Sequence, residues 1–371
     1  MANLLESLDD VLLLGPGPST IPPEVYRALG RRTLGHMDSQ FFELMDGIKE
    51  SLRLVMGTAN RATITISGTG TAGMEATLVN LIEAGDPMLV VVNGFFAARL
   101  AEMARRLGAV VDTLEFPWGK PIETKEVEKR LSSGAYKILG MVHAETSTGV
   151  KNPIQDLGPP ARRAGALFIV DAVTSLGGLE MRADEWGIDA LYSCSQKCIG
   201  CPAGLSPVTF SEGAMKKAAG RSAPVPNYYL DMNLLMKYWD GSPRAYHHTA
   251  PANMYFGLYQ ALQLIREEGL EAVRKRHREA HEHLVAGLEG MGLSMLVEKP
   301  HRLPMLNTVL IPEGVDDAAV RKELRAVHKI EIGSGLGALA GKIWRIGLMG
   351  YSAKKENVDT LLGALRKILR R

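Results

Sequence analysis

A stretch rich in glycine and threonine, SGTGTAG at residues 67–73, stands between an apolar run and a helical pattern at 74–82. Glycines let a backbone approach a ligand closely, and the free N–H groups and dipole at a helix start favour an anion. The stretch therefore predicts a phosphate site, with a purely structural turn as the alternative. It also matches G-x-G-x-x-G, the dinucleotide fingerprint, although Asn93 stands where that fingerprint expects an acidic residue for the ribose.

An aspartate, Asp171, ends the apolar run at 167–170, where an ionised carboxylate needs a partner. A protonated pyridine nitrogen is such a partner, and keeping it protonated makes a pyridoxal ring an electron sink. The alternative is that Asp171 caps the segment that follows it. The residue alone leaves both interpretations open.

A lysine, Lys197, follows the next predicted strand and precedes a tight turn at 200–204. A lone lysine is usually a solvated surface charge. A lysine whose pKa is lowered by its site becomes nucleophilic, and a Schiff base with a cofactor aldehyde is the usual outcome. Because adjacent strands end at the same edge of an open α/β sheet, Asp171 and Lys197 should reach one ligand.

Cysteine and histidine clusters raise the question of a metal centre. Cys194, Cys198 and Cys201 have the C-x3-C-x2-C spacing of radical iron–sulfur enzymes, but they lie beyond the midpoint of the chain, so buried reduced thiols are the favoured interpretation. Disulfides are not expected for an odd number of cysteines. Neighbouring His247 and His248 should point in different directions on a regular backbone, and no third ligand is evident, so we expect no metal.

The elements that must position these residues alternate between apolar β-branched runs and helical patterns, which predicts an α/β fold with a mostly parallel sheet. Helical patterns at 254–265 and 271–288 are interrupted near Gly269. We predict an N-terminal arm (1–14), a large domain (15–268) and a small α+β domain (269–371). The expected strands are 62–66, 88–92, 138–143, 167–170, 190–193 and 206–210 in the large domain, and 308–311, 330–332 and 343–346 in the small one.

The overall composition is that of a globular protein. The 371 residues include 46% hydrophobic and 23% charged residues, with a formal net charge of +2. No apolar run reaches the length of a membrane span, and no basic block interleaves with aromatics, so we expect neither membrane nor nucleic acid as a partner. The first residues lack the character of a secretory signal and the last are not a peroxisomal address, so we expect a cytoplasmic protein.

Eight motifs, in order along nearly the whole chain, resemble those of the class V, fold-type I aminotransferases, in the alanine–glyoxylate and serine–pyruvate aminotransferase family. This resemblance implies a large domain on a mostly parallel seven-stranded sheet and a smaller C-terminal α+β domain. The matching stretches are LLLGPGPS, GHMD at 35–38, SGTGTAGMEA, HAETSTGV at 143–150, VDAVTSLGG, YSCSQKC, YHHTAP at 246–251 and WRIGLMG at 344–350.

The resemblance implies pyridoxal 5'-phosphate as the cofactor of the large domain. Lys197 matches the Schiff-base lysine, and Asp171 matches the partner of the pyridine nitrogen. Phe96 matches the aromatic residue that stacks on the ring, where the family often has Trp; taken alone it would be a core residue. The remaining cofactor positions that match are Thr69, Gly70, Thr71 and Gln196 at the phosphate and Val173 on the opposite ring face.

Four further residues match positions that contact substrate or the neighbouring subunit. Ser147 matches a cofactor or substrate contact, and Tyr246 and Thr249 match residues that reach the phosphate of the partner in a homodimer with shared active sites. Arg345 matches the clamp for the substrate carboxylate. Taken alone it would be a surface cation, although it sits in an apolar strand pattern where an unpaired charge is costly.

The implied activity is a ping-pong transamination from alanine or serine to glyoxylate or pyruvate, with Lys197 as both cofactor anchor and general base. The family also contains lyases and transaminases of ureidoglycine and kynurenine derivatives, so those activities stay open. Two interpretations from other classes also stay open. They are a nicotinamide-dependent oxidoreductase that uses the glycine-rich loop, and a non-catalytic protein that binds a phosphate ligand.

Overall fold

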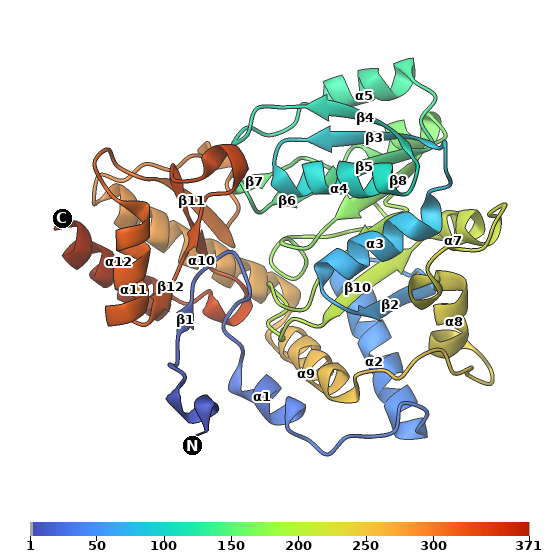
Figure 1. Ribbon diagram of the computed structural model, residues 1–371, viewed down its shortest axis with the longest axis horizontal. Coiled ribbons are helices and arrows are strands. Elements are labelled where there is room, and N and C mark those ends of the chain that lie inside the picture. The colour runs from blue at the N-terminus through green and yellow to red at the C-terminus, as the bar shows by residue number, and fades with distance from the viewer. Residues whose placement is uncertain (1–2, 371) are drawn as a thin grey trace.

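A computed structural model describes residues 3–370 as an α/β protein with a large sheet and a smaller α+β part beside it (Figure 1). All neighbouring strands of the large sheet are parallel, except for the pairs that β10 forms with β2 and β9. The predicted fold, with a mostly parallel seven-stranded sheet, is confirmed. Its strand order is β2 (Ala62–Ser67), β10 (Leu205–Phe210), β9 (Ala190–Tyr192), β8 (Leu167–Asp171), β5 (Ile138–Val142), β3 (Pro87–Val92) and β4 (Val110–Glu115).

Six of these strands coincide with the predicted runs, and β4 was not predicted. Its sequence, VVDTLE, mixes apolar and polar residues, and none of its residues is fully buried because it lies at the sheet edge. An edge strand has a neighbouring strand on one side only, so more of its residues meet solvent, and its sequence is less hydrophobic than that of a central parallel strand.

Helices pack against the large sheet, and two of them carry predicted site residues in their first turns. In Figure 1, α3 and α4 lie in front of the sheet, and α2 and α9 lie below β2 and β10. The helices of this part are α1 (Pro23–Leu29), α2 (Ser39–Met56), α3 (Gly70–Leu81), α4 (Phe95–Arg106), α5 (Thr124–Ser133), α6 (Gly158–Arg163), α7 (Glu212–Ala219), α8 (Met232–Asp240) and α9 (Ala252–Glu268), with the short elements β6 (Ala144–Glu145), β7 (Val150–Lys151) and η2 (Tyr228–Leu230).

The smaller part has its own apolar core, to which Leu14 from the N-terminal arm also contributes. Strand β1 (Leu12–Leu13) pairs in parallel with β12 (Ile330–Glu331), so the arm attaches to this part. Its other elements are α10 (Leu270–Glu289), η3 (Lys299–His301), β11 (Leu306–Leu310), α11 (Asp317–Val327), β13 (Gly333–Ser334), η4 (Gly337–Leu339), β14 (Ile343–Gly347), η5 (Gly350–Ser352) and α12 (Lys355–Leu369).

The interruption predicted near Gly269 is confirmed, since α9 ends at Glu268 and Gly269 has a φ of +85°. The next helix, α10, spans both cores, because Val273 packs in the large one and Leu284 in the small one. The predicted domain boundary at 268/269 falls at this turn and stays a prediction.

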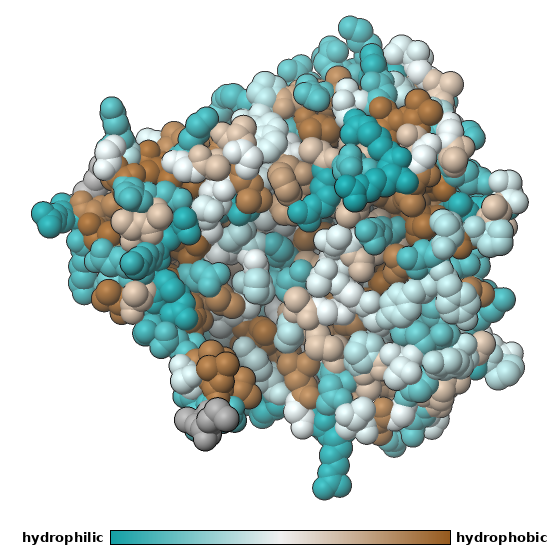
Figure 2. Space-filling view, in the orientation of Figure 1, coloured by the Kyte–Doolittle hydropathy of each residue, from teal (hydrophilic) through white to brown (hydrophobic). Residues whose placement is uncertain are grey.

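The molecular surface is mixed in polarity, and the N-terminal arm carries a compact apolar group (Figure 2). Leu4, Leu5 and Leu8, in and beside η1 (Leu4–Ser7), are between 63% and 74% exposed. Within residues 3–370 no helix combines the length and the apolarity needed to cross a membrane.

Candidate active site

The carboxyl ends of β2, β5, β8 and β9 surround a cavity of about 160 Å³. Eight predicted residues line it together, as expected for strands that end at one edge of a sheet. They are Thr69, Gly70, Thr71, Phe96, Asp171, Val173, Gln196 and Lys197, and Met74, Arg99, Val142, Ala144 and Thr146 complete the lining. The other four predicted residues, Ser147, Tyr246, Thr249 and Arg345, do not line this cavity.

The predicted phosphate loop leads directly into the N-terminus of α3. Thr69 is the N-cap residue, but its side chain makes no capping hydrogen bond, so the hydroxyl is available to a ligand. The first N–H groups of a helix have no partner within it, and the helix dipole adds positive potential there. A Cβ on Gly70 would lie 3.1 Å from Cys194 and from Val173, so glycine allows the helix start to approach the loops after β8 and β9.

Asp171 lies at the end of β8 and is almost fully buried. Its Oδ1 accepts a hydrogen bond from the backbone N–H of Val173 at 2.8 Å, and its Oδ2 accepts one from the Tyr192 hydroxyl at 2.9 Å. Burial raises the pKa of the carboxyl group to about 7. Asp171 can therefore both cap the following turn and serve as the partner of a ligand nitrogen, because it bonds to Val173 and also faces the cavity.

Lys197 is 9% exposed, which excludes a solvated surface lysine. Burial lowers the pKa of its ammonium group, which increases the share of neutral amine. Its Nζ donates a hydrogen bond to the carbonyl of Pro16, and a Cβ on Gly17 would lie 2.6 Å from that nitrogen. The sequence did not predict this contact with the N-terminal loop, although the GPGP turn was a visible signal.

Glu145 and Ser147 fix the start of α4, the helix that carries Phe96. The buried carboxylate of Glu145 accepts hydrogen bonds from the N–H of Ala97 at 3.1 Å and the hydroxyl of Ser147 at 2.6 Å. The same hydroxyl accepts the N–H of Phe95 at 2.9 Å. Burial raises the pKa of Glu145. Ser147 thus orders the cavity wall in this structure, and its direct contact with cofactor or substrate stays a prediction.

Arg345 lies on β14 and is buried, which excludes a surface cation. Its Nε donates to the carbonyl of Ser334 at 2.6 Å, and a terminal nitrogen donates to the carbonyl of Thr146 at 3.4 Å. Burial lowers the pKa of the guanidinium group to about 10, so it stays charged at neutral pH. Because Thr146 lines the cavity, Arg345 places a cation beside it.

The segment 246–249 departs from one expectation. Tyr246 and Thr249 are exposed, whereas His247 and His248 are buried and face each other, with their Nδ1 atoms 2.8 Å apart. The expectation that the two rings point in different directions was wrong, because this backbone is irregular rather than helical or extended. Within the described residues 3–370, no three His, Cys, Asp or Glu side chains are grouped to hold a metal ion.

The predicted burial of the three cysteines is confirmed, and all three are free thiols. Burial raises the pKa of each to about 12. Cys194 and Cys198 donate hydrogen bonds to the carbonyls of Val173 at 3.8 Å and Thr174 at 3.4 Å. They therefore hold the loop after Asp171 against the Lys197 loop.

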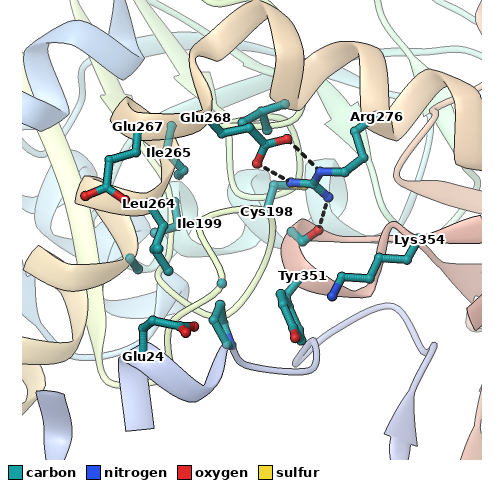
Figure 3. Close-up of a pocket in the computed structure, with 15 residues that line it drawn as sticks. Glu24, Cys198, Ile199, Leu264, Ile265, Glu267, Glu268, Arg276, Tyr351 and Lys354 are labelled. Atoms are coloured by element: carbon teal, nitrogen blue, oxygen red, sulfur yellow. Dashed lines mark hydrogen bonds and ion pairs between the residues drawn. The ribbon is translucent and has the colours of Figure 1, made fainter. Parts of the chain in front are cut away.

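A second hollow, of about 480 Å³, lies where α1, α9, α10 and η5 meet next to the Lys197 loop (Figure 3). The positively charged side chains that line this hollow already interact with other groups of the protein. Arg276 forms an ion pair with Glu268 at 2.7 Å and donates to the carbonyl of Gly350 at 2.7 Å, and the Lys354 ammonium lies 3.4 Å from the centre of the Tyr351 ring. These contacts tie α10 to η5, so we assign this hollow a structural role.

Comparison with known proteins agrees with this geometry. The family described as aminotransferase class-V matches residues 13–361. An alanine–glyoxylate aminotransferase of Callithrix jacchus is 42% identical over 366 residues, covering 98% of this chain and 88% of that protein. A (S)-ureidoglycine–glyoxylate transaminase of Bacillus subtilis is 39% identical, covering 97% and 90%. The crystal structure of an alanine–glyoxylate aminotransferase from Nostoc sp. superposes with a TM-score of 0.96 at 49% identity, covering all of both chains. The chain belongs to the class V aminotransferase family.

Proposed function

We propose that this enzyme uses pyridoxal phosphate to transfer an amino group from alanine or serine to glyoxylate or pyruvate. The observation that carries the proposal is the single cavity in which the Lys197 amine, the Asp171 carboxylate and the anion-binding start of α3 meet. A nicotinamide oxidoreductase needs no buried lysine at such a place, and a mere binding protein needs no amine with a lowered pKa.

The chemistry of the cavity fits pyridoxal phosphate. The phosphate needs hydrogen-bond donors, which the exposed hydroxyls of Thr69 and Thr71 and the start of α3 offer. The pyridinium needs a carboxylate, and within the described residues Asp171 forms no ion pair. The buried Oε1 of Gln196 has no hydrogen-bond partner within this part of the chain, so its carboxamide is also free to meet a ligand.

The proposed mechanism assigns one task to each residue. Pyridoxal phosphate, when bound, supplies a ring that accepts negative charge from the substrate Cα. Asp171 would hold the protonated pyridine nitrogen of this ring. With the cofactor bound, Lys197 would hold it through Nζ, and the same amine, once free, would remove the Cα proton of the donor. Arg345 orients the donor by its carboxylate, so that the Cα–H bond faces Nζ.

The acceptor is better supported than the donor. Two relatives that differ in the named donor, alanine or ureidoglycine, share glyoxylate in their names. We therefore propose glyoxylate as the preferred acceptor, with alanine or serine as donor and ureidoglycine as the alternative. A cytoplasmic location is part of the proposal.

A half-reaction screen tests the proposed function. Purified enzyme loaded with pyridoxal phosphate is mixed with each donor in turn, and the visible absorbance of the cofactor bound to Lys197 is followed. Alanine or serine should bleach it, and glyoxylate should restore it. An enzyme that stays colourless with pyridoxal phosphate, or one protected by a nicotinamide nucleotide instead, would refute the proposal.

Arg345→Lys should weaken the use of amino and oxo acids by about 2 kcal/mol or more, because a lysine cannot reproduce the bidentate fork of a guanidinium on a carboxylate. Steady-state kinetics with alanine and glyoxylate measure the loss. The absorbance of bound cofactor and the reaction with amines that lack a carboxylate should change little. If the variant handles alanine and glyoxylate as well as the parent enzyme, Arg345 is not the clamp.

The proposed homodimer can be tested by complementation between two inactive variants. Tyr246 and Thr249 point outward, and the exposed leucines of the arm offer apolar surface to a partner. Equal amounts of Lys197→Ala and a Tyr246→Phe/Thr249→Ala variant are mixed. Half of the randomly formed dimers then contain both chains, and each of these has one complete site out of two, so about one quarter of the activity should return.

The control for this mixture is a chain that carries all three substitutions. Mixed with either inactive variant, it should restore nothing, because no complete site can form. Absence of complementation in the first mixture, after exchange of subunits has been demonstrated by mass spectrometry, would contradict shared active sites.

A further inference from the structure

His247 and His248 lie inside the segment 246–249, are buried, and link this segment to Ser67 at the start of the predicted phosphate loop. They are only 6% and 8% exposed. The ring of His247 stacks on Tyr228 with a centroid distance of 5.1 Å, and the ring of His248 lies edge-on to Tyr229 and Tyr238 at 5.0 and 5.7 Å. These contacts leave the two imidazoles little freedom to turn.

The carbonyl oxygen of Tyr228 fixes the donor and acceptor of each hydrogen bond that joins His247, His248 and Ser67. The backbone carbonyl of Tyr228 can only accept, so Nε2 of His247, at 3.1 Å, carries a proton. In the neutral ring Nδ1 of His247 is then an acceptor, and it takes the Nδ1 proton of His248 at 2.8 Å. Nε2 of neutral His248 is therefore an acceptor too, and the Ser67 hydroxyl donates to it at 3.1 Å.

Ser67 is the last residue of β2 and leads straight into the phosphate loop. The next residue, Gly68, donates its N–H to the carbonyl of Gly204 at 2.8 Å, so the loop is held from both sides. Tyr246 precedes the two histidines in the sequence and Thr249 follows them, and both of these residues are exposed. The hydrogen bond between Ser67 and His248 therefore links the phosphate loop to the outward segment.

We propose that His248 is a positioning residue that couples the phosphate loop of its own subunit to the segment 246–249, which completes the phosphate site of the partner subunit. This inference rests on the proposed cofactor and dimer. A phosphate bound at one site then orders the segment that serves the other site, so the two sites of a dimer fill with positive cooperativity. Pyridoxal has no phosphate, so its binding should not depend on this coupling.

The first test compares the cofactor affinities of two variants of the apoenzyme. His248→Leu fills similar space but breaks the connection, whereas His248→Gln can accept from Ser67 and donate to His247 through its amide. Titration with pyridoxal phosphate and with pyridoxal, followed by visible absorbance, should show about a tenfold loss for pyridoxal phosphate alone in His248→Leu. His248→Gln should retain the parent affinity within about threefold.

The outcomes of this titration separate the inference from the proposed function. If the parent enzyme binds neither cofactor, the proposed function fails. If His248→Leu loses affinity for pyridoxal as strongly as for pyridoxal phosphate, or for neither, the positioning role fails while the function stands. Thermal melting of the apoenzymes shows whether His248→Leu is folded, and its affinity for pyridoxal separates a general loss of structure from the loss of a phosphate-dependent contact.

The second test uses dimers assembled from two differently tagged chains, in which only one chain carries Lys197. In one dimer, His248→Leu is placed on the Lys197→Ala chain, so it can act only through the segment offered to the partner. In the other dimer, His248→Leu is placed on the chain with Lys197, so it acts through that chain's own phosphate loop. Coupling predicts a weakened affinity for pyridoxal phosphate in both dimers. A defect in only one of them, or a protein that sediments as a monomer, would overturn the coupling.

Discussion

Lys197→Ala should reduce turnover by about 10⁴-fold or more, because one substitution removes both the cofactor anchor and the general base. The fold should persist. The side chain lies in the cavity, and among residues 3–370 the hydrogen bond lost with it is the one that Nζ donates to Pro16. Steady-state transamination measures the loss, and circular dichroism with thermal melting monitors the fold.

A matched control is Lys342→Ala, which removes an exposed lysine just before β14 and should leave activity unchanged. Borohydride reduction of the parent enzyme with pyridoxal phosphate, followed by peptide mass spectrometry, should place the cofactor on Lys197. Labelling of a different lysine, or a Lys197→Ala enzyme with substantial turnover, would overturn the assignment of the site.

Asp171→Asn should keep bound cofactor but lose about 10³-fold in the half-reaction rate, equivalent to about 4 kcal/mol of transition-state stabilisation. A neutral amide cannot hold the proton on the pyridine nitrogen, so the ring no longer accepts charge from Cα. The amide oxygen can still accept from Val173, so the local turn should survive. Tyr192→Phe is the control, because it removes a neighbouring hydroxyl but leaves the carboxylate.

The same substitution has a consequence for stability that does not depend on activity. Burial raises the pKa of Asp171 from 3.8 to about 7 in the protein without cofactor. Below pH 4 the folded and unfolded states both carry the proton. Between about pH 4 and 7 only the unfolded state ionises, so the apoenzyme loses stability as the pH rises. Denaturant titrations should show this decline in the parent apoenzyme and a smaller one in Asp171→Asn. Equal slopes would indicate that Asp171 is ionised without its cofactor.

The sequence by itself determined the features that depend on local pattern. The loop at 67–73, Asp171 and Lys197 each lie at or just beyond the end of a predicted strand, and the alternation of strands with helices predicted that all three meet at one edge of the sheet. The break at Gly269 and the burial of the cysteines also followed from local signals. The residue roles and the substrate class came from resemblance of ordered motifs, not from periodicity.

Tertiary structure decided what depends on contacts between distant segments. Pro16 reaches Lys197 from the loop that follows β1, and β1 itself is held by its pairing with β12 of the smaller part. Tyr192 meets Asp171 through the register of β8 with β9. The paired rings of His247 and His248 follow from an irregular backbone. Such contacts leave no periodic signal in the sequence, since each is set by how whole elements pack, and packing is a property of the folded chain.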